Sequence, residues 1–224
     1  MKFSIYCMLL AATTVVFPKS ILLIGDSHLL GAYGKTLDFL LRSSKSDVVR
    51  TYGACGAIAS SWTNLANKEK YSFTSCGYSE NTPTRFFQTN TKRKIPTLKS
   101  LVKVPPDQII ISLGTNYVSE KNSRMIMLDI SDLLDQLIKY SPNTQCIWIG
   151  PPDSRKFHHK MIKINRTIKN FISSECTYFD SFNQTQYPVH GGDGVHFYGS
   201  EPLDNEAKKW AQNVYQFLIP FNSK

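Results

Sequence analysis

The amino-acid sequence predicts an α/β fold, a three-layer sandwich with a central parallel sheet of about five strands and helices on both faces. Short, almost wholly apolar runs, typical of strands buried on both faces, alternate with longer segments whose apolar residues recur at helical spacing. Polar and glycine-rich residues follow the apolar runs, as expected where loops at the carboxyl ends of parallel strands carry function.

Five segments are predicted to be strands. Residues 20–25 (SILLIG) are the most apolar and end in glycine, and the other four are residues 47–52, 107–113, 146–149 and 177–180. Helical periodicity predicts helices over residues 29–42, about 126–138, about 161–172 and about 203–218, and Pro142 marks the end of the second.

Residues 58–102 interrupt the alternation with a polar stretch that is rich in aromatic residues. Loops of this length inside compact domains are uncommon unless they are functional or locally structured. Two interpretations stay open: an insertion that forms a substrate-selecting wall, or a loop that only covers the edge of the sheet.

Residues 1–18 are interpreted as a signal peptide, because one Lys precedes a charge-free apolar run of suitable length. An uncleaved membrane anchor or a first strand is the alternative, since no clean A-x-A cleavage site precedes Pro18. Residues 19–224 are then expected to form a single domain, and the protein is expected to be secreted or periplasmic.

Removal of the leader leaves four cysteines, Cys55, Cys76, Cys146 and Cys176. An oxidising compartment favours two disulfides. We favour Cys55 with Cys76, and Cys146 with Cys176, because the second pair opens two segments that are predicted to be neighbouring strands. A bond between Cys55 and Cys76 would either hold a catalytic loop rigid or only fix the insertion of residues 58–102 in place.

The formal net charge of +9 favours attraction to anionic surfaces such as an envelope polymer. Nucleic acid is not expected as a partner, because the basic residues are spread along the chain and the one compact cluster, residues 92–94, is typical of a solvated loop. No metal or organic cofactor is expected, since the chain lacks C-x-x-C and H-x-x-x-H spacings. No stable protein partner is implied.

Polar groups that follow successive strands are expected to meet at one edge of the sheet. They are Asp26, Ser27 and His28 after the first strand, Gly53 and Gly56 after the second, and Gly114, Thr115 and Asn116 after the third. A later glycine-rich loop adds Asp193 and His196, which are three residues apart.

Ester hydrolysis needs a hydroxyl activated by a base, a third group that orients the base, and donors for the oxyanion. Ser27 lies where a strand turns into a helix, so it is the candidate nucleophile. His196 is the candidate base and Asp193 the group that orients it. His190 lies close to both in the sequence and is the competing base.

Four strings in order resemble the block I, II, III and V signatures of the SGNH (GDSL-like) hydrolase superfamily: IGDSH (Ile24–His28), YGACG (Tyr52–Gly56), GTN (Gly114–Asn116) and DGVH (Asp193–His196). The resemblance spans residues 20 to about 200 and implies a flavodoxin-like SGNH fold. It departs from the family in lacking the usual Asn before the block II glycines, and in His28, which stands where many relatives have Leu or Ser.

The resemblance also implies site roles. It makes Ser27 the nucleophile and first oxyanion donor, Gly56 the second donor through its N–H, and Asn116 the third through its side chain. It makes Asp193 and His196 the remaining members of the triad, in preference to His190, because HGGD lacks the family's Asp-x-x-His order. Asp26 and Gly114 are expected to support the turns.

The sequence therefore predicts a serine esterase that works through an acyl-enzyme. O-acetyl groups on a cell-envelope or other polysaccharide are the expected substrate, because aromatic and basic residues suit acidic sugars. Three alternatives stay open: a lipid or lysophospholipid acyl esterase, an acetyl transferase with the same triad, and a catalytically silent glycan-binding module.

Overall fold

A computed structural model of the chain describes residues 19–43, 48–63, 78–79, 81, 86–87, 95–120 and 122–222. The predicted signal peptide lies outside the described residues, as does most of the predicted insertion. Among the described residues, no helix has both the length and the apolar character needed to cross a membrane.

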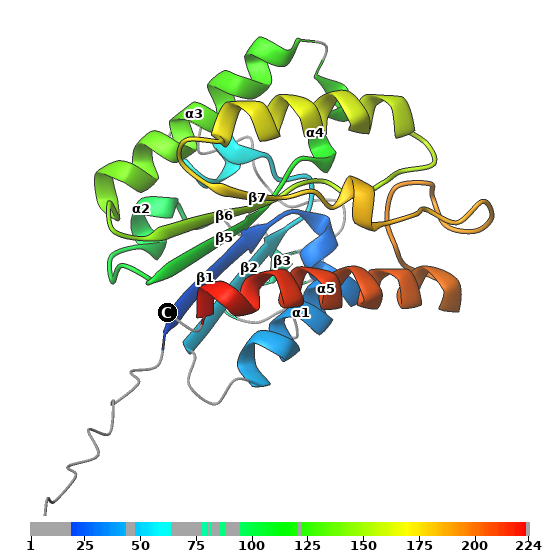
Figure 1. Cartoon of the computed structure of the whole chain (residues 1–224), viewed down its shortest axis with the longest axis horizontal. Coiled ribbons are helices and arrows are strands. Elements are labelled where there is room, and N and C mark those ends of the chain that lie inside the picture. The colour runs from blue at the N-terminus through cyan, green and yellow to red at the C-terminus, as the bar shows by residue number, and fades with distance from the viewer. Residues whose placement is uncertain are drawn as a thin grey trace, which may run out of the picture.

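A central sheet forms the middle layer (Figure 1), in the order β4-β3-β2-β1-β5-β6-β7. Five of its strands are parallel, which confirms the predicted sheet: β1 (Ser20–Gly25), β2 (Val48–Ala54), β5 (Gln108–Ser112), β6 (Gln145–Ile149) and β7 (Thr177–Phe179). The strand boundaries agree with the predicted ones to within about two residues.

Two further strands, β3 (Tyr78–Ser79) and β4 (Phe86–Phe87), were not predicted. They run antiparallel and extend the sheet from the carboxyl end of β2, where Ala54 pairs with Tyr78. Strands of two residues carry no alternation of polar and apolar positions, so the sequence could not reveal them. This part of the predicted insertion covers the edge of β2.

Helices cover both faces of the sheet. The α-helices are α1 (Ala32–Ser43), α2 (Leu98–Leu101), α3 (Ser123–Tyr140), α4 (His158–Ile172) and α5 (Glu201–Asn222). Short 3-10 helices lie at η1 (Ser27–Leu30), η2 (Ala59–Trp62), η3 (Thr115–Ser119) and η4 (Phe182–Gln184). Figure 1 shows α3 and α4 on one face and α1 and α5 on the other.

The strands supply apolar side chains to both faces, because successive residues of a strand point in opposite directions. In β1, Leu22 and Ile24 pack into the core formed with α3 and α4, whereas Ile21 and Leu23 pack into the core formed with α1 and α5. All four side chains are fully buried. This two-sided burial explains why the strand sequences are continuous apolar runs.

The helix expected from residue 29 begins only at Ala32, because Gly31 adopts an extended conformation and separates η1 from α1. Gly34 of α1 then passes so close to η1 that an added Cβ would overlap the Leu29 carbonyl. The chain therefore makes a sharp turn after β1, and a glycine permits α1 to pack directly against it.

A disulfide joins Cys146 of β6 to Cys176, which directly precedes β7, as predicted from their places beside neighbouring strands. The two Cα atoms are 4.6 Å apart. Cys76 lies outside the described residues, so the pairing of Cys55 with Cys76 stays a prediction.

We predict that replacing both Cys146 and Cys176 by Ala lowers the free energy of unfolding by roughly 3–4 kcal/mol. The bond closes a loop with a sequence separation of 30, and a loop of that size restricts the unfolded chain substantially. Urea unfolding of the double variant against wild type measures the change. An unaltered urea midpoint would contradict the prediction.

Candidate active site

Ser27 is the first residue of η1, directly after β1 at the carboxyl edge of the sheet. Asp26 caps this turn: its carboxylate accepts the N–H of His28 at 3.0 Å, and its own N–H donates to the Ser112 carbonyl at 3.3 Å. The capped turn fixes the backbone on both sides of Ser27 and ties it to the end of β5.

Ser27, His196 and Asp193 form a continuous chain of hydrogen bonds. Ser27 Oγ lies 2.9 Å from His196 Nε2, and His196 Nδ1 lies 2.6 Å from Asp193 Oδ2. The two ring nitrogens thus face the hydroxyl and the carboxylate respectively. With the Nδ1 proton donated to Asp193, Nε2 is free to accept the Ser27 proton.

The Asp193 carboxylate is held by its own loop as well as by the imidazole. Its Oδ1 accepts the N–H groups of Val195 at 2.8 Å and His196 at 2.7 Å. Partial burial raises the pKa of Asp193, but the hydrogen bonds from His196 and these two N–H groups outweigh it and leave the pKa below its ordinary value. Asp193 is therefore ionised near neutral pH.

The predicted oxyanion donors surround the same edge. Gly56 follows β2 with a φ of +71°, in the left-handed region that favours glycine, and nothing lies within 4 Å of where a Cβ would be. Asn116 lies in η3, and its Nδ2 donates one hydrogen bond to the Ala57 carbonyl at 2.9 Å. That bond ties the loop after β2 to the loop after β5, and leaves the second amide hydrogen of Asn116 for a ligand.

Gly114 precedes η3 with a φ of +146°, and an added Cβ would meet the Pro151 ring at 2.5 Å. This conformation and this close contact both favour glycine at position 114. A larger residue would displace the turn that carries Asn116.

Asp26 is almost completely buried, at 2% exposed. Burial raises its pKa to about 7, although the hydrogen bond from the His28 N–H and the nearby His196 both lower it. A group that supports the nucleophile thus changes charge near physiological pH.

The His28 ring lies next to the His196 ring, with the two ring centroids 5.4 Å apart, and it packs edge to face against Trp210. Burial lowers the pKa of His28 to about 3, so the ring is neutral at physiological pH. Its Nε2 is buried and finds no hydrogen-bond partner among the described residues. The sequence did not predict that this histidine is buried.

A cavity of about 280 Å³ opens beside the triad. Its walls come from two segments, one beginning at Ser27 and the other at His196: Ser27, His28, Leu30, Gly31, Tyr33, His196, Phe197 and Tyr198. Tyr198 is 53% exposed, and its ring centroid is 5.5 Å from that of His196. An aromatic face is thus available to a ligand next to the proposed base.

Side chains that the sequence analysis did not single out hold the loop that carries Asp193 and His196. The Tyr187 hydroxyl accepts the Gly194 N–H and donates to the His196 carbonyl, both at 3.0 Å. Ser154 Oγ donates to the Gly194 carbonyl at 2.7 Å. No motif marks these residues, because they act through the backbone of the loop.

Asp153 anchors the same region from the end of β6. Its carboxylate accepts the Tyr187 N–H at 3.0 Å and lies 2.7 Å from His158 Nδ1. His158, His159 and His190 are exposed. The described residues hold no group of three or more His, Cys, Asp or Glu side chains placed to bind a metal ion.

No family model and no curated protein matches the chain. Solved structures do match it. A carbohydrate acetylesterase from Sinorhizobium meliloti is 14% identical with a TM-score of 0.61, covering 91% of this chain and 99% of that one. A peptidoglycan O-acetylesterase is 13% identical with a TM-score of 0.62, covering 92% of both chains.

A member of the lipolytic G-D-S-L family from Veillonella parvula is also similar, at 14% identity and a TM-score of 0.54, covering 88% of this chain and 98% of that one. The chain therefore has the fold of the SGNH hydrolases, as the four sequence blocks implied.

We predict that wild type loses stability relative to Asp26→Asn as the pH rises from 5 to 8. Because the pKa of Asp26 is raised in the folded protein, the folded protein keeps a proton on Asp26 between about pH 4 and 7. The unfolded chain has already released that proton, so the free energy of unfolding of wild type falls as the pH rises through this range. The substituted amide does not titrate and keeps an oxygen acceptor for the His28 N–H.

Urea unfolding of both proteins at pH 5 and pH 8 measures the effect. The difference in free energy of unfolding between the two proteins is expected to change by roughly 2–3 kcal/mol between pH 5 and pH 8. A difference that stays constant with pH would show that Asp26 does not titrate in this range.

Proposed function

We propose that the protein is a serine esterase that hydrolyses oxygen esters through an acyl-enzyme intermediate. The observation that carries the proposal is the chain of hydrogen bonds from Asp193 through His196 to Ser27, with distances of 2.6 and 2.9 Å. Esterases among the structures with the same fold give independent support.

In the proposed mechanism, Ser27 Oγ attacks the ester carbonyl carbon while His196 Nε2 takes the hydroxyl proton. The tetrahedral oxyanion accepts hydrogen bonds from the N–H groups of Ser27 and Gly56 and from Asn116 Nδ2. Asp193 stabilises the imidazolium that forms at His196.

The intermediate then collapses, the bond to the alcohol oxygen breaks, and His196 returns its proton to that oxygen. The acyl group stays on Ser27. A water molecule, deprotonated by His196, attacks the acyl-enzyme and releases the carboxylic acid, which restores the Ser27 hydroxyl.

We further propose O-acetyl groups on a secreted or cell-envelope polysaccharide as the substrate, with the protein itself secreted. Three observations support this choice. The net charge is +9, which suits an acidic polymer. The exposed ring of Tyr198 beside His196 provides a face on which a sugar can stack. Two proteins of the same fold are named as a carbohydrate acetylesterase and a peptidoglycan O-acetylesterase.

We propose that the cavity next to Ser27 takes a short acyl group; its lining among the described residues includes Ser27 and His196 but neither Gly56 nor Asn116. Its volume of about 280 Å³ lies just below the roughly 300–1,000 Å³ of pockets that enclose drug-sized ligands. A lipid esterase needs a longer apolar groove for its substrate.

We predict that the protein hydrolyses p-nitrophenyl acetate and butyrate faster than octanoate or longer esters, and that Ser27→Ala abolishes turnover. Ser173→Ala is the matched control, since Ser173 is an exposed residue at the end of α4 and the change is chemically the same. The control is expected to keep wild-type kcat/KM.

Release of acetate from O-acetylated polysaccharides, compared with the same polymers after alkaline deacetylation, then tests the substrate. A preference for octanoate would indicate that the substrate is a lipid ester and not an acetylated polysaccharide. A folded protein that binds the polymer but turns over no ester would overturn the esterase and leave a glycan-binding module. Transfer of acetyl to an added sugar in place of water would identify an acetyl transferase.

A further inference from the structure

The loop that delivers Asp193 to the site has little structure of its own. Residues 185–199 form no helix or strand. Gly191, Gly192 and Gly194 all have positive φ values, of +83°, +60° and +83°. Glycine loses more conformational freedom on folding than any other residue. The loop therefore needs contacts from elsewhere in the protein to hold one conformation.

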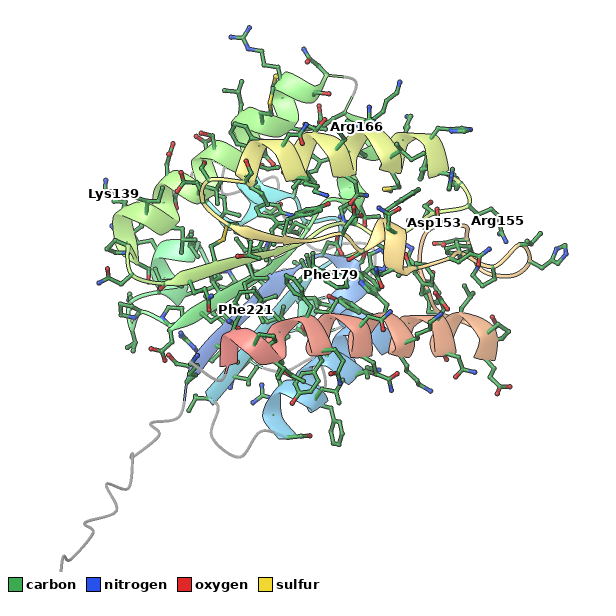
Figure 2. All side chains as sticks on the ribbon, in the orientation of Figure 1. Lys139, Asp153, Arg155, Arg166, Phe179 and Phe221 are labelled. Atoms are coloured by element: carbon green, nitrogen blue, oxygen red, sulfur yellow. A yellow bond between two sulfur atoms is a disulfide. The ribbon has the colours of Figure 1, made fainter. Side chains whose placement is uncertain are left out.

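Arg155, in the segment between β6 and α4, supplies such contacts (Figure 2). Its guanidinium donates to carbonyl oxygens along the loop: Nη1 to Pro188 at 3.0 Å and Val189 at 2.7 Å, and Nη2 to Gly191 at 2.9 Å and Gly192 at 3.5 Å. Its carbon Cζ also lies 5.3 Å from the centre of the Tyr187 ring. One side chain thus binds four of the five carbonyls of residues 188–192, all except that of His190.

Ser154 and Lys156, the residues on either side of Arg155, bind Gly194, which directly follows Asp193. Ser154 Oγ and the Lys156 N–H both donate to the Gly194 carbonyl, at 2.7 and 3.0 Å. Asp193 therefore lies between two anchored stretches, residues 188–192 on one side and Gly194 on the other. All of these anchors come from residues 154–156.

We propose that Arg155 is a positioning residue that holds residues 188–192 and thereby keeps Asp193 in hydrogen-bonding contact with His196. This inference rests on the proposed esterase function. Arg155 touches neither Ser27 nor the His196 ring in the structure, so it acts through the loop and not on the substrate. Without the guanidinium, the carbonyls lose their shared donor and Asp193 departs from the geometry that orients the base.

The geometry favours arginine over lysine at this position. A planar guanidinium presents several N–H groups in fixed directions, and two of its nitrogens contact two carbonyls each. A lysine ammonium is a single point and cannot span the same set of oxygens. Arg155→Lys is therefore expected to behave more like Arg155→Ala than like wild type.

The test compares Arg155→Ala with Arg166→Ala, which removes an identical side chain from the solvent-exposed face of α4 (Figure 2). Arg155→Ala is expected to lower kcat for p-nitrophenyl acetate roughly 10- to 100-fold with little change in KM, because small displacements of a catalytic group cost rate more than binding. Arg166→Ala is expected to leave both constants unchanged. Guanidinium at low, non-denaturing concentration is expected to restore part of the activity of Arg155→Ala only.

Hydrogen exchange of the backbone amides in residues 188–196 provides a readout that needs no esterase activity. Arg155→Ala is expected to speed exchange in this loop while the strands keep wild-type protection, and Arg166→Ala is expected to change neither. If wild type shows no turnover, the esterase proposal fails and the exchange still tests the anchor. Unchanged kcat together with unchanged exchange in Arg155→Ala would overturn the role of Arg155.

Discussion

The parallel register of β1 with its two neighbours is the constraint on which the rest of the site depends. Gly25 pairs with Gly53 of β2 on one side and with Ser112 of β5 on the other, so the three strands end at the same level. The loops that follow them, which carry Ser27, Gly56 and Asn116, therefore leave the sheet side by side. A slip of one residue in either pairing would move a donor by about 3.3 Å and turn buried side chains to the wrong face.

Asp193 and His196 are held differently, because no strand delivers them. They reach Ser27 through a glycine-rich loop whose own backbone has few internal bonds. Ser154 and Arg155 bind that loop from outside, and Tyr187 binds it from within. The site thus joins a half fixed by the sheet to a half fixed by side chains. The second half is the more sensitive to single substitutions, since a lost side chain there is not replaced by neighbouring ladder bonds.

Much of the fold could be predicted from the sequence, because strands buried on both faces must be continuous apolar runs, as SILLIG is. The candidate triad could also be predicted, since its chemistry restricts residue type and spacing to short strings such as GDSH and DGVH. The strands β3 and β4 could not, because two residues carry no periodicity. The contacts of Arg155 were equally invisible, since any segment can offer backbone carbonyls and only the folded chain shows which ones converge.

The burial of His28 illustrates the same limit. Its position next to Ser27 indicated a place near the site, but its ring packs against Phe197 of the loop before α5 and Trp210 of α5, both far away in the sequence. Local spacing therefore identified the candidate reacting groups, whereas the environment that shifts their pKa values arises only from tertiary packing.

Labelling by a serine-directed fluorophosphonate, with the modified residue identified by mass spectrometry, tests whether His196, and not His190, activates Ser27. We expect rapid labelling at Ser27 in wild type and in His190→Ala, and labelling slowed by several orders of magnitude in His196→Ala. Equal labelling rates in the two histidine variants, or modification at a different serine, would contradict this expectation.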